Sequence, residues 1–207
     1  MYIPKNYLLK DQKEIIDFMQ KFNFASIVST VDQQLFATHL PFTISSEEGK
    51  IVLSSHFAAA NPQWKTLGKQ RSMVIFTEPH AYISTRNYDK AENVPTWNYL
   101  AVHAYGTAEI IDEASATMTV LKEMMQSFEP EYQEQWNALP DAYKAKMVKG
   151  IKAFRIRVDD LQAKHKLSQN RNLSEQLKII DHLGDAGNEN EQLITDYMRR
   201  NLSANSE

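Results

Sequence analysis

The sequence contains no cysteine, which excludes disulfide bonds, thiolate metal sites and cysteine nucleophiles. A secreted fold held by disulfides is therefore ruled out, and the reducing cytoplasm is the expected compartment. No stretch approaches the roughly 18 consecutive apolar residues of a membrane-spanning helix, and the first residues lack the apolar segment of a secretory signal. We expect a cytoplasmic protein without a membrane partner.

An excess of positive charge is also missing. The 207 residues include 23 Lys and Arg against 26 Asp and Glu, a net charge of -3. Proteins that bind nucleic acid through phosphate contacts usually carry a basic surface. The basic residues are dispersed here and no helix-turn-helix is evident, so direct DNA binding is doubtful.

Several catalytic and phosphate-binding motifs are absent as well. None of the six histidines has the spacing of a zinc site, and no metal is expected. There is no Gly-x-Ser-x-Gly nucleophile motif. The glycine-rich dinucleotide and Walker motifs are missing too, which argues against a doubly wound sheet.

The composition is that of a globular protein, with 43% apolar and 24% charged residues. The patterns of apolar residues predict many strands and few strand-helix-strand units, which is typical of an α+β barrel or sandwich. Strands are predicted over residues 24–31, 35–44, 50–56, 72–77, 81–84, 97–110 and 153–158. Helices are predicted after an Asp11 cap and over residues 62–69, 113–128, 140–149, 173–183 and 190–200.

One segment combines a strand end with a predicted helix start. Ser54, Ser55 and His56 end the strand, small residues follow, and Asn61 precedes Pro62 as a helix cap would. Exposed N–H groups at a helix start, with Lys65 nearby, are typical of an anion site. The alternative is an ordinary connection at a barrel rim.

A second segment is rich in aromatic residues. Along residues 97–106, Trp97, Tyr99 and His103 fall on one face of a strand, and Asn98 and Leu100 fall on the other. Such a face suits a planar heterocycle, a subunit interface or a core strand equally well.

A third segment, residues 164–172, gathers several hydrogen-bond donors before a helix. It is either a solvated loop or a group of cations that reaches a phosphate.

These segments, in this order, resemble the PaiB-type family of FMN-binding split-barrel proteins, which shares the fold of pyridoxamine phosphate oxidases. The Pro-Thr-Trp-Asn-Tyr run at 95–99 and the Leu-Ser-Gln-Asn-Arg run at 167–171 carry the resemblance most specifically. Further matching runs lie at 38–42, 56–64 and 78–84. The sequence departs from the family at Asn87, where an aromatic residue is usual.

The resemblance implies a six-stranded antiparallel split β-barrel over residues 1–170 and a C-terminal helical extension over residues 171–207. It also implies a homodimer with FMN at the subunit interface. The phosphate is expected near residues 54–56 and Asn61, and the ring system near residues 38–40, with the 167–171 segment of the partner closing over it. The cofactor-binding residues implied in this way are Thr38, His39, Leu40, Ser54, Ser55, His56, Ala58, Asn61, Trp64, Lys65, Trp97, Asn98, Lys166, Ser168, Gln169 and Arg171.

Three functions stay open at this point. The first is a flavoprotein, with an FMN-dependent oxidoreductase of unnamed substrate as one form of it. The second follows from the family's name, a negative transcriptional regulator that acts indirectly or is gated by flavin. The third is a haem-binding split barrel with His39, His56 or His103 as axial ligand.

Overall fold

The computed structural model describes residues 1–185 and 188–204, so residues 186–187 and 205–207 of the expected C-terminal extension lie outside the described residues. The chain divides into two compact units, each assembled from separated segments. Unit 1 combines Met1–Ile15, Thr77–Val102 and the described part of the segment from Gln162 onward. Unit 2 combines Ile16–Phe76 and His103–Leu161.

Eight strands occur in the described residues, and the pairs β1–β2, β1–β5, β3–β4, β4–β7 and β6–β7 are antiparallel. The strand order is β2-β1-β5-β6-β7-β4-β3, with β8 paired to β6. The strands are β1 (Phe24–Val31), β2 (Gln34–Pro41), β3 (Thr43–Glu47), β4 (Lys50–Ala58), β5 (Arg71–Ile83), β6 (Thr96–Ile111), β7 (Ile151–Arg157) and β8 (Asp160–Lys166). The predicted α+β class is confirmed, with two strands more than the expected six.

Three strand predictions need correction. The single strand expected over 35–44 is two strands, because Phe42 turns its fully buried ring into the core between β2 and β3. The separate strands expected over 72–77 and 81–84 form one strand, β5, in which the buried residues change from even to odd numbers near Glu78. β8 was not expected, since its residues are largely polar and it is held by backbone pairing with β6.

Four phenylalanine rings form the centre of unit 2, and all four are fully buried. Phe154 of β7 stacks on Phe57 of β4 with ring centroids 4.9 Å apart. Phe42 meets Phe76 and Phe154 edge-on at 5.9 and 6.1 Å. Large buried rings in contact contribute strongly to stability, so this cluster fixes how the strands of unit 2 pack.

Helices cover parts of unit 2 as the sequence predicts, with one addition. α3 (Ala114–Phe128) packs Val120 and Met124 against Ala153 of β7. α5 (Asp141–Lys149) confirms the helix expected over 140–149, whereas the short α4 (Tyr132–Ala138) between two prolines was missed. α2 is shorter than expected, Trp64–Leu67 rather than 62–69.

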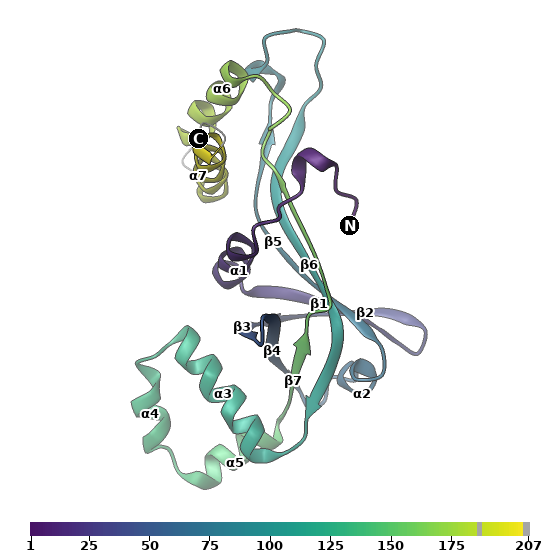
Figure 1. Ribbon diagram of the computed structural model, residues 1–207. Coiled ribbons are helices and arrows are strands. Elements are labelled where there is room, and N and C mark those ends of the chain that lie inside the picture. Colours follow the sequence, from purple (N-terminus) through teal and green to yellow (C-terminus); the bar gives the residue numbers. More distant parts are fainter. Residues whose placement is uncertain (186–187, 205–207) are drawn as a thin grey trace. The chain divides into compact units, whose positions relative to one another are not determined.

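Unit 1 contains the two C-terminal helices, α6 (Leu173–Gly184) and α7 (Glu189–Ala204), which pack on each other (Figure 1). Asn172 caps α6 by accepting a hydrogen bond from the backbone N–H of Glu175 at 2.9 Å. Met198 of α7 contacts Asn98 on the buried face of β6. Both expected helices of the extension are thus confirmed within the described residues.

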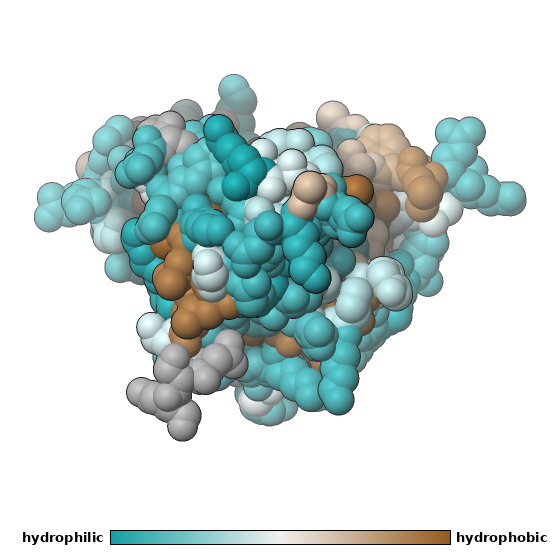
Figure 2. Space-filling view, turned by 90° about the horizontal axis from the view of Figure 1, so that it is seen from above, coloured by the Kyte–Doolittle hydropathy of each residue, from teal (hydrophilic) through white to brown (hydrophobic). Residues whose placement is uncertain are grey.

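Short helical turns complete the chain, η1 at Lys5–Tyr7 and η2 at Thr85–Asn87. The first α-helix, α1 (Gln12–Lys21), begins as expected, because the backbone N–H of Glu14 donates to Asp11 Oδ1 at 3.0 Å. No helix among residues 1–185 and 188–204 is both long and apolar enough to cross a membrane. Figure 2 shows a mostly hydrophilic face on which hydrophobic residues gather in small patches.

Gly106 marks a close approach of β6 to β7. A Cβ atom at this position would collide with the backbone oxygen of Arg157 and lie 2.6 Å from Ile156 Cγ2. Gly150 is a useful contrast, since a Cβ there would meet its nearest atom, Met147 O, at 3.4 Å.

We predict that Gly106→Ala lowers the free energy of unfolding by about 1–3 kcal/mol, because a side chain forced into a packed core shifts its neighbours. Gly150→Ala should change it by less than about 1 kcal/mol in either direction. Urea denaturation of both variants measures the difference. Equal stability of the two variants would contradict the close packing at Gly106.

Candidate functional site

The side chain of Gln63 is the centre of a buried polar network in unit 2. It is fully buried, and its Nε2 donates to Ser29 Oγ at 2.9 Å and to the carbonyls of Ile27 and Phe36 at 3.2 Å each. Its Oε1 accepts a hydrogen bond from Thr38 Oγ1 at 2.6 Å. We call these five residues the Gln63 hub.

Asn61 connects the hub to the loop that follows β4. Its Nδ2 donates to Thr38 Oγ1 at 3.0 Å, and its Oδ1 accepts from the backbone N–H of Gln63 at 2.9 Å. Asn61 therefore caps the turn that precedes α2 rather than the α-helix itself, which begins three residues later. The structure thus brings the predicted residues Thr38 and Asn61 into contact.

The predicted phosphate donors of β4 do not all lie on one side. Successive residues of a strand face opposite sides, so Ser54, His56 and Ala58 share one face and Ser55 faces the other. Ser55 is fully buried and donates to the carbonyl of Pro41 at 2.7 Å. Its hydroxyl hydrogen is therefore engaged within the protein.

His56 carries a buried ring nitrogen, Nδ1, that has no hydrogen-bond partner among the residues the structure describes. Desolvation lowers the pKa of His56 below its ordinary value, so the neutral ring is favoured at neutral pH. A neutral imidazole nitrogen either donates or accepts one hydrogen bond. His56 Nδ1 is thus a buried polar atom whose hydrogen bond is not made within the described residues.

The remaining predicted residues of unit 2 lie at the surface or near it. His39 is exposed on β2, where its Nδ1 lies 2.7 Å from Ser26 Oγ, and Leu40 is half-buried. Trp64 donates from Nε1 to the carbonyl of Ala59 at 3.0 Å. Lys65 is exposed on α2, and its ammonium is thus available to an anionic ligand.

The predicted residues Trp97 and Asn98 of unit 1 lie on opposite faces of β6, as the alternation predicts. Trp97 is half exposed, whereas Asn98 is fully buried. Ser168 donates to Asn98 Oδ1 at 3.0 Å, and Asn98 Nδ2 lies 3.5 Å from Met198 Sδ. Asn98 is therefore a structural residue of the buried face.

The 167–171 segment, expected to close over the cofactor, follows β8 and is held to unit 1 by hydrogen bonds of its own side chains. Gln169 bonds to the backbone of residues 165 and 167. Arg171 donates to Asn93 Oδ1 at 2.7 Å and lies 3.8 Å over the ring of Tyr88. Lys166 donates to the carbonyl of Trp97 at 2.6 Å and to Thr96. Lys166, the last residue of β8, has hydrogen-bond partners that are all uncharged.

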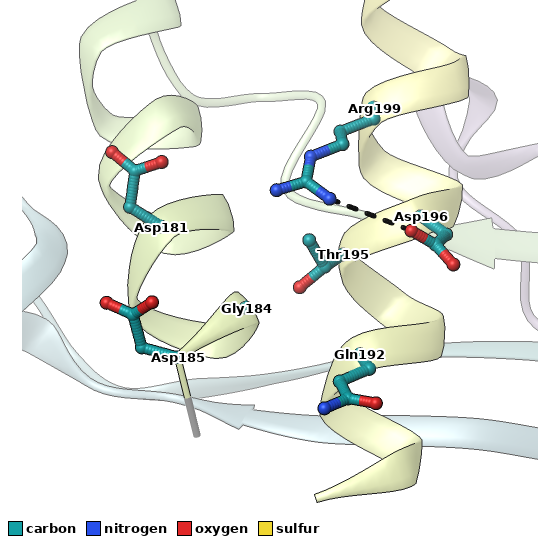
Figure 3. A pocket seen from close by; sticks show the side chains of 7 residues that line it. All are labelled: Asp181, Gly184, Asp185, Gln192, Thr195, Asp196 and Arg199. Carbon is teal, nitrogen blue, oxygen red and sulfur yellow. Dashed lines mark ion pairs between the residues drawn. The ribbon is translucent and has the colours of Figure 1, made fainter. Parts of the chain in front are cut away.

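Hollows on the two units are lined by other residues. One of about 460 Å³ lies between α6 and α7 and has three aspartates among its seven lining residues, with Asp196 paired to Arg199 at 3.7 Å (Figure 3). Two others, of about 420 and 180 Å³, share Glu109 and Arg155 as lining residues. None of these three hollows contains a residue of the predicted cofactor site. The described residues also hold no group of three or more His, Asp or Glu side chains placed to bind a metal.

The sequence did not predict the role of Gln63, a buried residue that makes hydrogen bonds to the predicted site residues Thr38 and Asn61. The run Asn61-Pro62-Gln63 signalled a helix start, but nothing in it distinguishes a buried glutamine from an exposed one. The burial of Lys164 was also not predicted: the 164–172 segment was expected to be a solvated loop or a group of cations, yet Lys164 is 9% exposed on β8.

Comparison with known proteins identifies the family. Residues 1–160 match the model of the family described as "Putative FMN-binding domain". The chain belongs to this family. It is 37% identical to the Protease synthase and sporulation protein PAI 2 of Bacillus subtilis, over 98% of both chains. The resemblance to the PaiB-type family and the expectation of FMN as cofactor are confirmed.

Solved structures of similar fold are more distant in sequence. The Flavocytochrome Anf3 from Azotobacter vinelandii superposes with a TM-score of 0.64 at 17% identity, covering 79% of this chain and 72% of the other. The FAD and Heme binding protein from Mycobacterium smegmatis gives 0.64 at 16% identity, covering 83% and 78%. These likenesses show the fold alone, and the split barrel expected for the FMN-binding family is confirmed.

We predict that Gln63→Glu destabilises the protein in a pH-dependent way. A carboxylate placed against the carbonyls of Ile27 and Phe36 is desolvated and repelled, so its pKa in the folded state is raised above the unfolded value of about 4.3. The folded state then binds more protons than the unfolded state above that pH, and stability falls as pH rises. Urea denaturation at pH 5 and pH 8 measures this.

The expected loss at pH 8 is about 2 kcal/mol or more, and smaller at pH 5. Gln34→Glu, exposed on β2, carries the same change of charge as a control and should cost less than about 0.5 kcal/mol at either pH. If Gln63→Glu behaves like Gln34→Glu at both pH values, the buried hub is refuted.

Proposed function

We propose that this member of the FMN-binding family is a cytoplasmic homodimeric flavoprotein that holds FMN beside the Gln63 hub and acts as an oxidoreductase. Its family match over residues 1–160 carries the proposal. Three groups of unit 2 fit an anionic cofactor rich in hydrogen-bonding groups: the Lys65 ammonium, the Asn61 amide and the unpaired His56 Nδ1. Bound FMN supplies the redox chemistry, and the protein binds and orients it.

Each residue has a distinct task in this proposal. Lys65, exposed and charged, binds the phosphate. The hub fixes Thr38 and Asn61 in place through short hydrogen bonds, so that these groups meet the cofactor without first losing side-chain freedom. Neutral His56 offers a single hydrogen bond from a desolvated position.

The grouping of the predicted residues supports the proposed dimer. Thr38 and Asn61 of unit 2 are joined to Gln63 by hydrogen bonds, whereas Trp97 and Lys166 belong to unit 1. We propose that the second group reaches the cofactor from the partner subunit. Lys166, the last residue of β8, is the cation that we assign to this contact. It makes hydrogen bonds within its own unit, as Ser168, Gln169 and Arg171 do, but its partners Trp97 and Thr96 are uncharged, whereas Arg171 lies 3.9 Å from the Glu175 carboxylate.

A regulatory role is the second candidate, favoured by the 37% identity to a Bacillus subtilis protein named for protease synthesis and sporulation. The net charge of -3 disfavours direct contact with DNA phosphates. An indirect effect on gene expression, with the occupancy or redox state of the flavin as the signal, fits both the 37% identity and the net negative charge. Specific duplex binding with a steep salt dependence would instead support direct regulation.

We predict that the purified protein retains FMN or takes it up, with absorbance bands near roughly 375 and 450 nm that survive desalting. Lys65→Met should weaken FMN binding about tenfold through loss of a charged contact to phosphate. Lys69→Met, which removes another exposed lysine four residues further along the chain, is the matched control and should bind normally. Titration of apoprotein by absorbance gives each affinity.

A colourless protein that ignores FMN would refute the proposal. In that case haemin is the next ligand to add, because a shifted Soret band would indicate the haem-binding alternative. Normal FMN binding by Lys65→Met would show that the phosphate does not bind at Lys65 of α2, and the assignment as a flavoprotein would still stand.

A further inference from the structure

Two hollows of unit 2 share the same pair of charged residues. The larger, of about 420 Å³, lies between the end of β6, the turn that follows it and the start of α3. The smaller, of about 180 Å³, is lined by residues of β3, β4, β6 and β7. Glu109 of β6 and Arg155 of β7 line both hollows, so a carboxylate and a guanidinium face the same open space.

Glu109 and Arg155 do not form an ion pair with each other, although they are directly opposite in the antiparallel pairing of β6 and β7. Opposite charges at such positions have Cβ atoms about 5 Å apart and usually attract each other. Arg155 instead donates from Nη2 to the carboxylate of Glu123 on α3, at 3.0 and 3.2 Å. Glu109 is exposed and has no ion-pair partner among residues 1–185 and 188–204. A cationic group that meets Glu109 therefore displaces no partner.

Arg155 also retains hydrogen-bonding capacity on the side of the hollows. Its Nη1 lies 3.9 Å from Glu47 Oε1, which is too far for a hydrogen bond, and Glu47 pairs with Arg157 at 3.2 Å. The side chain of Arg155 is 33% exposed, and a guanidinium carries five N–H donors, of which Glu123 engages only those of Nη2. Arg155 can therefore donate to an acceptor that enters the hollow.

The start of α3 adds to the larger hollow, which Ala116 and Thr119 line from the helix. Glu113 precedes α3, and its side chain accepts no hydrogen bond from the first turn. The first N–H groups of a helix have no partner inside it and favour an anionic group. Ile110 and Ile111 line the same hollow with apolar surface.

We propose that the larger hollow binds an amphoteric small molecule of the α-amino acid class. Its ammonium meets Glu109, and its carboxylate meets Arg155 and the start of α3. An apolar side chain packs against Ile110 and Ile111. A ligand with only a negative charge would be repelled by Glu109, and one with only a positive charge would be repelled by Arg155. None of these residues is assigned to FMN, so the inference does not rest on the proposed function.

Ligand-observed NMR titration of the purified full chain tests the proposal, with glycine, L-alanine, L-valine and L-leucine as probes. We expect saturable binding of at least one of these amino acids. The one that binds most tightly is then compared with the amine that lacks its carboxylate and with the acid that lacks its ammonium. Each analogue should bind at least about tenfold more weakly, because each loses one charged contact.

Two variants locate the site. Glu109→Gln removes the charge and keeps the shape of an exposed side chain, and Ala116→Leu fills the hollow without removing a polar group. Each should weaken binding by about tenfold or more. Glu134→Gln, exposed on α4, and Ala114→Leu, exposed on α3, are the matched controls and should bind as the wild type does. A thermal melt of each variant checks that it is folded, and Glu109→Gln tests the site even if Ala116→Leu is not.

Failure of all four amino acids to bind would overturn the proposal. An amine or acid that binds as tightly as its parent amino acid would also overturn it, because a single charge would then be sufficient. Equal affinities of Glu109→Gln and Glu134→Gln would place the ligand elsewhere and refute the site. Titration of Glu109→Gln with FMN separates this inference from the proposed function, since FMN should bind the variant as it binds the wild type.

Discussion

The side-chain amide of Gln63 joins parts of the chain that lie far apart in sequence. Through one buried group, it connects the backbone of β1 and β2 with the loop after β4. A buried amide is stable only when its polar atoms are paired, and here the partners lie on two strands, Ile27 and Ser29 on β1 and Phe36 and Thr38 on β2. The positions of Thr38 and Asn61, and with them the surface offered to a cofactor, depend on this network.

The two groups of candidate residues differ in physical character. Around the hub, neutral amides and hydroxyls are held by short internal hydrogen bonds, and the charged Lys65 stands at the surface. In unit 1, Lys166 donates to the carbonyl of Trp97 and to Thr96, and the ring of Trp97 is half exposed. A flavin has both an extended polar chain and a flat ring system, so a protein that binds it needs both kinds of surface.

The sequence predicted the strands with regular alternation and the helices with clear caps. Asp11 and Asn172 cap α1 and α6, and Phe154 and Ile156 are buried in β7 as their spacing indicates. What escaped prediction depends on tertiary contacts. β8 has a polar sequence and exists through pairing with β6, and Gln63 and Lys164 are residue types that are usually exposed.

The site was predicted less completely than the fold for the same reason. Motifs located Thr38 and Asn61, which the structure joins, but spacing alone cannot show which donors are already used. Ser55, Asn98 and Arg171 make hydrogen bonds inside their own unit. Only the folded chain shows that Lys65 is exposed on α2 and that the buried His56 Nδ1 has no hydrogen-bond partner among the described residues.

The central claim is that two subunits share each FMN site, and a mixed dimer tests it most directly. Subunits carrying Lys65→Met and subunits carrying Lys166→Met, each with its own affinity tag, are produced together and the heterodimer is isolated. In a two-fold symmetric dimer with shared sites, one site carries both changes and the other carries neither. The account predicts one tight FMN site in each heterodimer and none in either parent; a heterodimer without a tight site would contradict it.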